Sequence, residues 1–345
     1  MPNVPPVVFN LLAAVAAFAA MIFFHELGHF LMARRVGVRV HAFALGFGPR
    51  VYGWKRGETM YALNLFPLGG YVRMEGEDDA RTGLDSFRSK SVGARAAIVA
   101  AGPVMNLLLA VVILAIAAGT GGVPGGASPR VGNVESGWPA QASGIRPGDV
   151  IVAINGEAMT NGDQVIETIH KSAGRPLTLI VRRGAEEITV NVTPRLDETR
   201  GVGRIGFSPE PTWSRLPPVA ALGWGIQRTG QFMVMLGEAV GRLIHEGTFF
   251  GSLGGPVAAG KILTQAAATG AQTFLHMAAF LSVIIGIFNL LPIPALDGGR
   301  LAFLTIEGIR RRPVDPRREG LVHMVGFAFL LLLLVVLTIR DVQRP

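Results

Sequence analysis

The protein has 345 residues, half of them hydrophobic and only 16% charged, which excludes an ordinary soluble domain and indicates a membrane protein. Its net charge of +8 is mostly arginine beside the apolar segments, a placement that favours an orientation signal over nucleic-acid binding. The absence of cysteine excludes disulfides and cysteine metal ligands.

The first apolar segment, residues 6–33, is long enough to cross a bilayer and lacks the basic start of a cleavable signal peptide. It carries the run HELGH, in which His25 and His29 share one face of a helix because they are four residues apart. Two imidazoles so placed can bind one Zn²⁺, and Glu26 beside them can take a proton from a water whose pKa the metal lowers. Ionisable residues inside an apolar helix are functional by default. The segment therefore predicts half of a hydrolytic zinc site.

Residues 41–74 alternate apolar and polar side chains between glycines, which predicts short strands and tight turns. This segment is too apolar for a loop in water, and non-helical backbone enters a membrane only where protein or water satisfies its polar groups. We therefore expect a small β-sheet that dips into the membrane beside the zinc site. A second span follows at residues 96–119, and the glycine-rich residues 119–128 predict a flexible linker.

Residues 129–197 predict a compact domain of strands and helices. Its run SGIRPGDVIVAING contains Gly144, Ile145, Gly148 and Asp149, and it resembles the signature of a PDZ domain. The glycines of this signature permit tight turns before an apolar strand. PDZ domains bind an extended peptide as an added edge strand, so a peptide ligand of unknown sequence is expected.

The connector, residues 198–272, contains a fairly apolar stretch at residues 222–245. Arg228, Glu238 and Arg242 within it would each be costly at the centre of a bilayer. We therefore predict an amphipathic helix that lies on the outer surface of the membrane or against the spans.

The third and fourth spans are predicted at residues 274–296 and 321–339, and the third ends in the run NLLPIPALDGG. Pro292 and Pro294 lack an N–H group and cannot continue a helix, so the chain should be extended there. Asn289 can donate and accept hydrogen bonds, so it could hold a substrate strand or a developing oxyanion.

A catalytic zinc site needs a third protein ligand besides the two histidines. The predicted topology puts Asp297, at the end of the third span, on the same side of the membrane as His25 and His29. Asp297 is the best candidate, and Glu58 and Glu75 are the alternatives that the sequence leaves open.

Lysine and arginine are concentrated between spans one and two and between spans three and four, and none precedes the first span. This bias places both short loops in the cytoplasm, and it places the two termini and the PDZ domain outside. The zinc site then lies near the cytoplasmic side of the membrane.

Nearly the whole chain resembles the bacterial site-2 proteases, which are intramembrane zinc metalloproteases, and most of all the branch that regulates sigma-E. The matching runs are FFHELGHFLMAR, GFGPR, PLGGYVRM, FRSKSVGARAAIVAAGPVMN, LGGPVAAGK and NLLPIPALDGG. When the first and last runs occur together in one chain, they are specific to this family. One departure is that the best-studied enterobacterial branch has two tandem PDZ domains, whereas this chain has room for one.

The resemblance implies a multi-pass enzyme of the bacterial inner membrane with one Zn²⁺, held by His25, His29 and Asp297, and with Glu26 as the base. It places further residues beside the substrate, namely Asn289, Pro292 and Pro294, together with Gly46, Phe47 and Gly48 of a membrane-entering sheet that binds the substrate as a strand. The expected substrates are single-span membrane proteins, such as anti-sigma factors, shortened beforehand on the outer side by another protease.

Two other functions fit the sequence less well than a protease does. A zinc or proton transporter would need polar residues staggered along several spans, but spans two and four offer little beyond Asn106 and His323. A membrane adaptor that works through its PDZ domain would have no need of Glu26.

The expected fold is therefore a polytopic α-helical membrane protein with four transmembrane helices, a membrane-entering β-sheet and one extracytoplasmic α+β PDZ domain. The expected boundaries are residues 1–119 for the N-terminal membrane core, 129–197 for the PDZ domain, 198–272 for the connector and 273–345 for the C-terminal membrane core.

Overall fold

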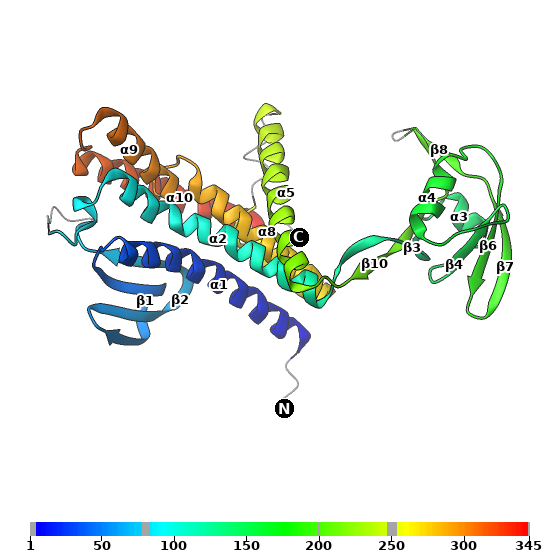
Figure 1. Ribbon diagram of the computed structural model, residues 1–345, viewed down its shortest axis with the longest axis horizontal. Helices are drawn as coiled ribbons and strands as arrows, with labels where there is room; N and C mark the ends of the chain where they lie inside the picture. Colours follow the sequence, from blue (N-terminus) through cyan, green and yellow to red (C-terminus); the bar gives the residue numbers. More distant parts are fainter. Residues whose placement is uncertain (1–4, 78–82, 199–200, 247–253, 344–345) are drawn as a thin grey trace. The chain divides into compact units, whose positions relative to one another are not determined.

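The computed structural model describes residues 5–77, 83–198, 201–246 and 254–343. The chain forms two compact units (Figure 1). One, here called the helical unit, combines Met1–Ala117 with Pro217–Pro345, and the other, the β-rich unit, is Ala118–Leu216.

Four helices of the described chain are long and apolar enough to cross a membrane. They are α1 (Pro6–Arg35), α2 (Val92–Thr120), α8 (Ala271–Leu290) and α10 (Pro316–Gln343). The four apolar segments predicted from the sequence are thus helical. The third is shorter than predicted, because the backbone turns extended at Leu291, with φ −66° and ψ 142°, and two prolines follow.

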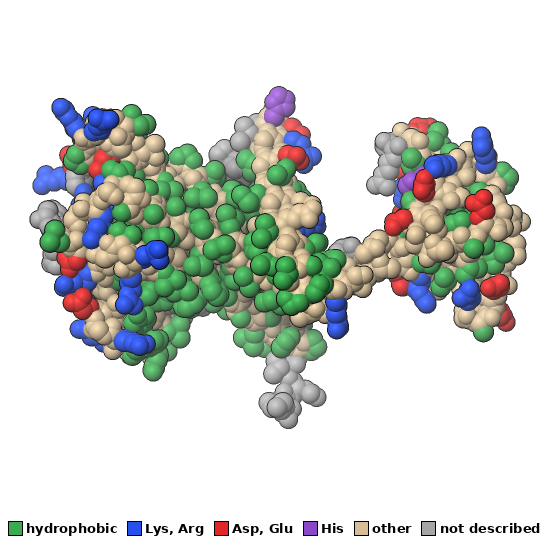
Figure 2. All heavy atoms as spheres, in the orientation of Figure 1, with side chains coloured by type: hydrophobic (Ala, Val, Ile, Leu, Met, Phe, Trp, Pro, Cys, Tyr) green, Lys and Arg blue, Asp and Glu red, His purple; other side chains and the backbone are tan. Residues whose placement is uncertain are grey.

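The helices of this unit pack through small and aliphatic side chains. Met21 of α1 is buried with Leu263 of α7 (Pro256–Thr269) and Leu281 of α8. The predicted helix at residues 222–245 lies within α5 (Pro218–His245), whose Phe232 packs with Leu114 of α2. Figure 2 shows hydrophobic side chains over the spans of this unit, and it shows lysine and arginine gathered at the end that carries the sheet and α9 (Asp297–Arg310).

The segment predicted to form strands is an antiparallel sheet of β1 (Val40–Arg56) and β2 (Thr59–Met74). Phe43 of β1 pairs with both Val72 and Tyr61, so the start of β1 lies between two runs of β2. Phe43 and Tyr61 also meet Phe30 of α1 edge to face, which fixes the sheet against the first span. Among the described residues, the last run of β2, residues 70–74, pairs on one side only.

The β-rich unit contains a sheet in the order β10-β3-β4-β6-β7, with β5 beside β4 and a separate pair β8-β9. Its strands are β3 (Val123–Val134), β4 (Val150–Ile154), β5 (Glu157–Ala158), β6 (Leu177–Arg183), β7 (Glu186–Val192), β8 (Arg195–Asp197), β9 (Val202–Arg204) and β10 (Phe207–Ser214). Two helices, α3 (Pro139–Ala142) and α4 (Gly162–His170), complete it. Alternate residues of β6 and the inner face of α4 supply its core.

The linker predicted at residues 119–128 is wrong in its second half. Residues from Val123 onward belong to β3 and pair with β10, where Trp213 lies opposite Pro124. A glycine-rich run shows no strand period, but the distant strand β10 supplies the hydrogen-bonding partners that hold it extended. The compact unit is consequently wider than the predicted range of 129–197.

The PDZ-like signature has a structural role in this unit. Gly144 and Gly148 adopt φ +83° and +92°, a region that suits glycine, and Ile145 is part of the buried core. The buried carboxylate of Asp149 accepts hydrogen bonds from the backbone N–H of Arg146 at 2.9 Å and from the guanidinium of Arg183 at 2.8 Å. The bonds from Arg183 lower the pKa of Asp149, so this carboxylate stays charged and clamps the turn to β6.

Candidate active site

The two histidines of the HELGH run lie on one face of α1, one turn apart. Their Nε2 atoms are 3.2 Å from each other, and both side chains are largely buried, with exposed fractions of 13% and 11%. The spacing of four residues produces this pairing, because side chains at i and i+4 stack on the same helix face.

Asp297 reaches the same point from the opposite end of the chain, as the first residue of α9. Its Oδ2 lies 3.1 Å from Nε2 of His25 and 3.4 Å from Nε2 of His29. Gly298 and Gly299 lie directly against backbone carbonyls of Leu291 and Ile293, where a Cβ atom would not fit. Glycine at these two positions therefore allows the preceding loop to fold back onto the start of α9.

The triangle formed by these three ligand atoms fits a zinc ion. Ligands about 2.0–2.1 Å from a tetrahedral zinc lie about 3.3–3.4 Å from one another, and the observed edges are 3.1, 3.2 and 3.4 Å. His25, His29 and Asp297 are the cluster of described residues whose ligand atoms converge in this way. The atom Oδ2 of Asp297 is buried without a regular hydrogen-bond donor, as expected for a ligand atom.

The imidazole of His29 is oriented by helix α2. Its Nδ1 donates to the carbonyl of Ile98 at 2.9 Å, which leaves Nε2 as the free acceptor that a metal requires. The ring lies directly on Gly102 of α2, and Gly28 of α1 lies against the carbonyl of Ala101, so neither position has room for a Cβ atom. Both glycines therefore allow the two helices to approach closely enough to hold the ring.

We expect Gly102→Ala to lower zinc content and peptidase activity by at least about tenfold, because its methyl group would displace the ring of His29. Zinc per purified chain is the direct measurement. Gly93→Ala is the matched control in the same helix, since a Cβ atom there meets nothing within 4 Å. Equal zinc content in the two variants would show that the contact with His29 does not position the ligand.

Glu26 lies in the same cavity as the three ligand groups, which has a volume of about 250 Å³. Its side chain rests against Gly70 of β2, where a Cβ atom would come within 2.7 Å of Cγ of Glu26. Val72 and Met74 of β2 line the cavity as well. The last run of β2 therefore forms one wall of the site, and among the described residues this run pairs with β1 on one side only.

The residues before Asp297 complete the other wall. Asn289 lines the cavity, and its Nδ2 donates to the carbonyl of Ile285 at 2.9 Å. Ala295 adopts φ +73°, and its N–H donates to Nδ1 of His323 in α10 at 2.9 Å. Pro294 packs on Gly326 of α10. The fourth span thus supports the loop that carries Asp297.

Pro292 and Pro294 keep the chain non-helical between α8 and α9, as predicted, but neither lines the cavity. Gly46, Phe47 and Gly48 also lie outside its lining. Instead Gly46 and Gly48 pack against Phe66, and the ring of Phe47 stacks on Tyr71 with centroids 6.4 Å apart.

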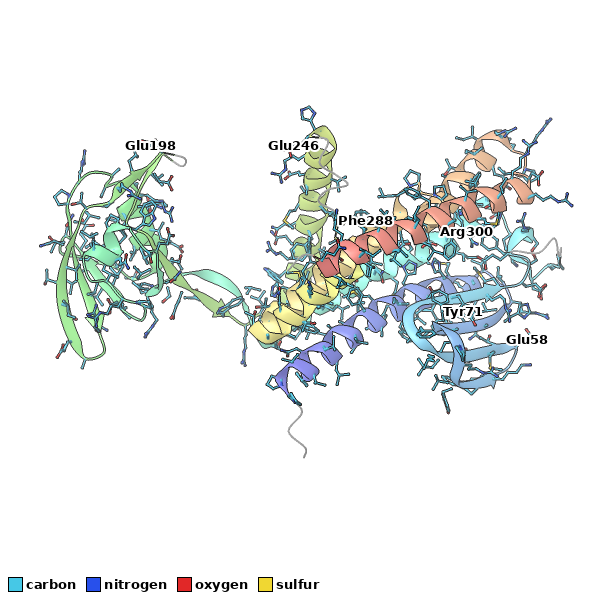
Figure 3. The ribbon with its side chains drawn as sticks, turned by 180° about the vertical axis from the view of Figure 1, so that it is seen from behind. Glu58, Tyr71, Glu198, Glu246, Phe288 and Arg300 are labelled. Atoms are coloured by element: carbon cyan, nitrogen blue, oxygen red, sulfur yellow. The ribbon has the colours of Figure 1, made fainter. Side chains whose placement is uncertain are left out.

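The two alternative third ligands lie elsewhere. Glu58 is at the tip of the β1–β2 hairpin (Figure 3), where it pairs with Arg39 at 3.2 Å. Glu75 pairs with Nε2 of His41 at 2.5 Å. Neither belongs to the cluster around His25.

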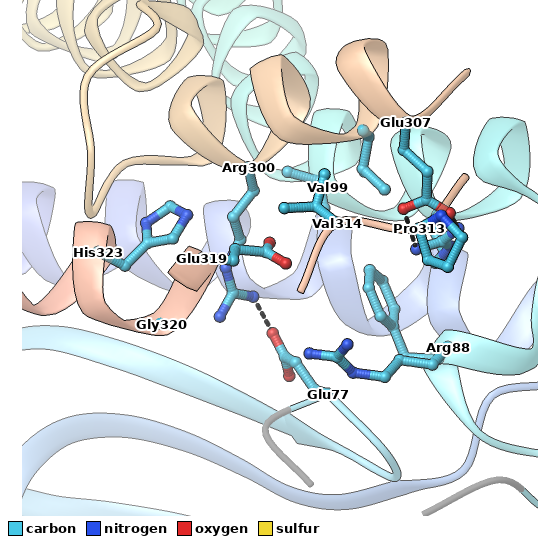
Figure 4. A pocket seen from close by; sticks show the side chains of 13 residues that line it. Glu77, Arg88, Val99, Arg300, Glu307, Pro313, Val314, Glu319, Gly320 and His323 are labelled. Atoms are coloured by element: carbon cyan, nitrogen blue, oxygen red, sulfur yellow. Dashed lines mark hydrogen bonds and ion pairs between the residues drawn. The ribbon is translucent and has the colours of Figure 1, made fainter. Parts of the chain in front are cut away.

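A second cavity of about 430 Å³, lined by both charged and apolar residues, adjoins the first and shares Glu77, Val99 and Arg300 with it. Arg300 of α9 forms an ion pair with Glu77 (Figure 4), and these two residues line both cavities. Sequence reasoning missed Gly102, Gly70, Glu77 and Arg300. A glycine next to Pro103 inside an apolar helix was the available signal for Gly102, whereas the pairing of Arg300 with Glu77 had none.

Comparison with known proteins agrees with this geometry. Residues 13–333 match the model of peptidase family M50. The chain belongs to this family. It is 31% identical to zinc metalloprotease RasP of Geobacillus kaustophilus, over 97% of this chain and 98% of that protein. It is also 31% identical to the regulator of sigma-W protease RasP of Bacillus subtilis, with the same shares covered.

This M50 peptidase is therefore a zinc metalloprotease, a hydrolase of the bacterial membrane that acts on membrane proteins. Membership of the family decides against the transporter and the adaptor. Among solved structures, the PDZ domain of the SdrC-like protein from Listeria monocytogenes is 24% identical and covers 24% of this chain and 86% of that chain, with a TM-score of 0.22.

Proposed function

We propose that His25, His29 and Asp297 hold the catalytic zinc ion, that Glu26 is the general base, and that the enzyme cleaves single-span membrane proteins within or near their spans. The observation that carries this proposal is the convergence of three ligand atoms, 3.1–3.4 Å apart, in a cavity that also contains Glu26.

Each residue has a defined task in this hydrolysis. A bound zinc ion lowers the pKa of water and polarises the scissile carbonyl group. Glu26 accepts the proton of the attacking water and passes it to the leaving amine. The bond from Nδ1 of His29 to Ile98 keeps Nε2 directed at the metal.

The substrate must unwind before it can be cut, because a membrane helix has its backbone groups already paired. The unpaired side of residues 70–74 in β2 offers backbone hydrogen bonds to an extended segment beside Glu26. Asn289 retains its carbonyl oxygen and one N–H for the substrate backbone. Pro292 and Pro294 shape the facing loop, and Gly46, Phe47 and Gly48 shape the sheet.

The orientation of the chain follows from its basic end. Lysine and arginine gather at the end of the helical unit that carries the sheet and α9 (Figure 2), which favours a cytoplasmic position for this end and for the zinc site. The termini and the β-rich unit, which carries the PDZ-like signature, then lie outside. There the unit would screen for substrates that an upstream protease has already shortened.

The test uses the purified full chain in liposomes with a model single-span protein, with either a short or a long folded outer domain. We expect cleavage of the short form, loss of cleavage when 1,10-phenanthroline removes the metal, and recovery when Zn²⁺ is added. Continued cleavage by metal-free enzyme would refute the zinc mechanism. Equal cleavage of both substrates would refute the screening role.

A further inference from the structure

A groove on α1 lies away from the zinc site. It has a volume of about 450 Å³, and its walls are almost entirely apolar. Phe23, Leu27 and Phe30 of α1 form one wall, and aromatic residues of the sheet, including Tyr52, Trp54 and Tyr61, form the other. Trp54 and Tyr61 are stacked with centroids 5.3 Å apart, and Trp54 remains 51% exposed.

The helix geometry separates this groove from catalysis. Successive residues of an α-helix are rotated by 100°, so Phe23, Leu27 and Phe30 point about 150° away from His25 and His29. A peptide bound at the zinc site therefore does not fill the groove. A different apolar molecule must cover it, or it faces the membrane interior directly.

A basic pocket of about 480 Å³ continues from this groove at Tyr61, which lines both. Arg34, Arg39 and Arg56 line the pocket. Arg39 is paired with Glu58 at 3.2 Å and with Asp85 at 2.8 Å, so these carboxylates are already neutralised.

Arg34 and Arg56 have no carboxylate partner among the described residues, and both side chains are exposed. The guanidinium of Arg34 lies 5.6 Å from the ring centre of Phe30, which is a wall of the apolar groove. Two positive charges without a carboxylate partner among the described residues thus lie beside the apolar groove. Aromatic rings beside arginines are typical of the boundary between headgroups and acyl chains.

We propose that the groove and the basic pocket together bind one anionic phospholipid. An acyl chain lies in the groove between α1 and the sheet, and Arg34 and Arg56 bind the phosphate-bearing headgroup. The apolar groove matches the acyl chain. The two guanidinium groups favour a lipid with net negative charge over a zwitterionic lipid. Such a lipid would bridge the first span and the sheet that forms the wall of the active site.

The experiment titrates the purified full chain in detergent with phosphatidylglycerol or with phosphatidylcholine of the same acyl chains, and native mass spectrometry counts the bound lipids. We expect the wild type to bind the first phosphatidylglycerol at least tenfold more tightly than phosphatidylcholine. Arg34→Gln combined with Arg56→Gln should reduce this preference to less than threefold.

The matched control is Arg310→Gln combined with Arg317→Gln, which removes the same charge from two other exposed arginines. This variant should keep the tenfold preference. Equal affinity of the wild type for both lipids, or an equal loss in both double variants, would overturn the proposal. Trp54→Ala should weaken binding of the long-chain lipid by at least threefold and leave dihexanoyl phosphatidylglycerol unaffected, and the reverse pattern would also overturn it.

Discussion

Replacing Glu26 by glutamine is expected to lower the rate of peptide cleavage about 10³-fold while one zinc ion per chain remains bound. A positioned general base contributes about 10²–10⁴-fold to such reactions, and glutamine has the same shape but cannot take a proton at neutral pH. Glu26 lines the cavity of His25, His29 and Asp297 without belonging to their ligand cluster. The measurement is the rate of cleavage of a single-span substrate in liposomes, together with zinc content.

Glu58→Gln is the control for this variant, because the same chemical change then falls on an exposed glutamate outside the cavity. It should cleave at close to the wild-type rate. Cleavage by the Glu26→Gln enzyme at the wild-type rate would mean that another group takes the proton. Loss of zinc from that enzyme would mean that Glu26 is needed for the metal itself.

Replacing Asp297 by alanine is expected to weaken zinc binding by more than about 100-fold and to abolish cleavage. The change removes one corner of the ligand triangle, and even the outer groups that orient metal ligands are worth 10–100-fold in affinity. Zinc stoichiometry after dialysis against a weak chelator measures this directly. The circular dichroism spectrum should stay helical, because α9 retains its packing through Leu304.

Glu58→Ala and Glu75→Ala provide the comparison, since the sequence left both open as third ligands. Each should keep a full zinc ion, because each carboxylate is paired with a basic side chain away from the cluster. Full zinc in the Asp297→Ala protein, or loss of zinc in the Glu58→Ala protein, would move the third ligand to a different residue.

Much of the site could be predicted from local pattern. The spacing of His25 and His29 places both side chains on one face of any α-helix that contains them. The prolines at 292 and 294 prevent α8 from continuing, whatever other elements lie nearby. The groups around them could not be predicted in this way. Gly102, Gly70 and Ile98 act on the site because other elements approach it closely, and local pattern does not show which elements meet.

By itself, the sequence determined the four apolar helices, the half-site on α1 and the non-helical loop before Asp297, because each depends on periodicity, composition or the chemistry of single residues. Only the tertiary structure decided that Asp297 rather than Glu58 or Glu75 meets the histidines, and that β2 beside Gly70 walls the cavity. The tertiary structure also holds residues 123–128 as part of a strand, where the sequence predicted a flexible linker. These outcomes depend on partners far away in the chain, whose packing and hydrogen bonds override local preference.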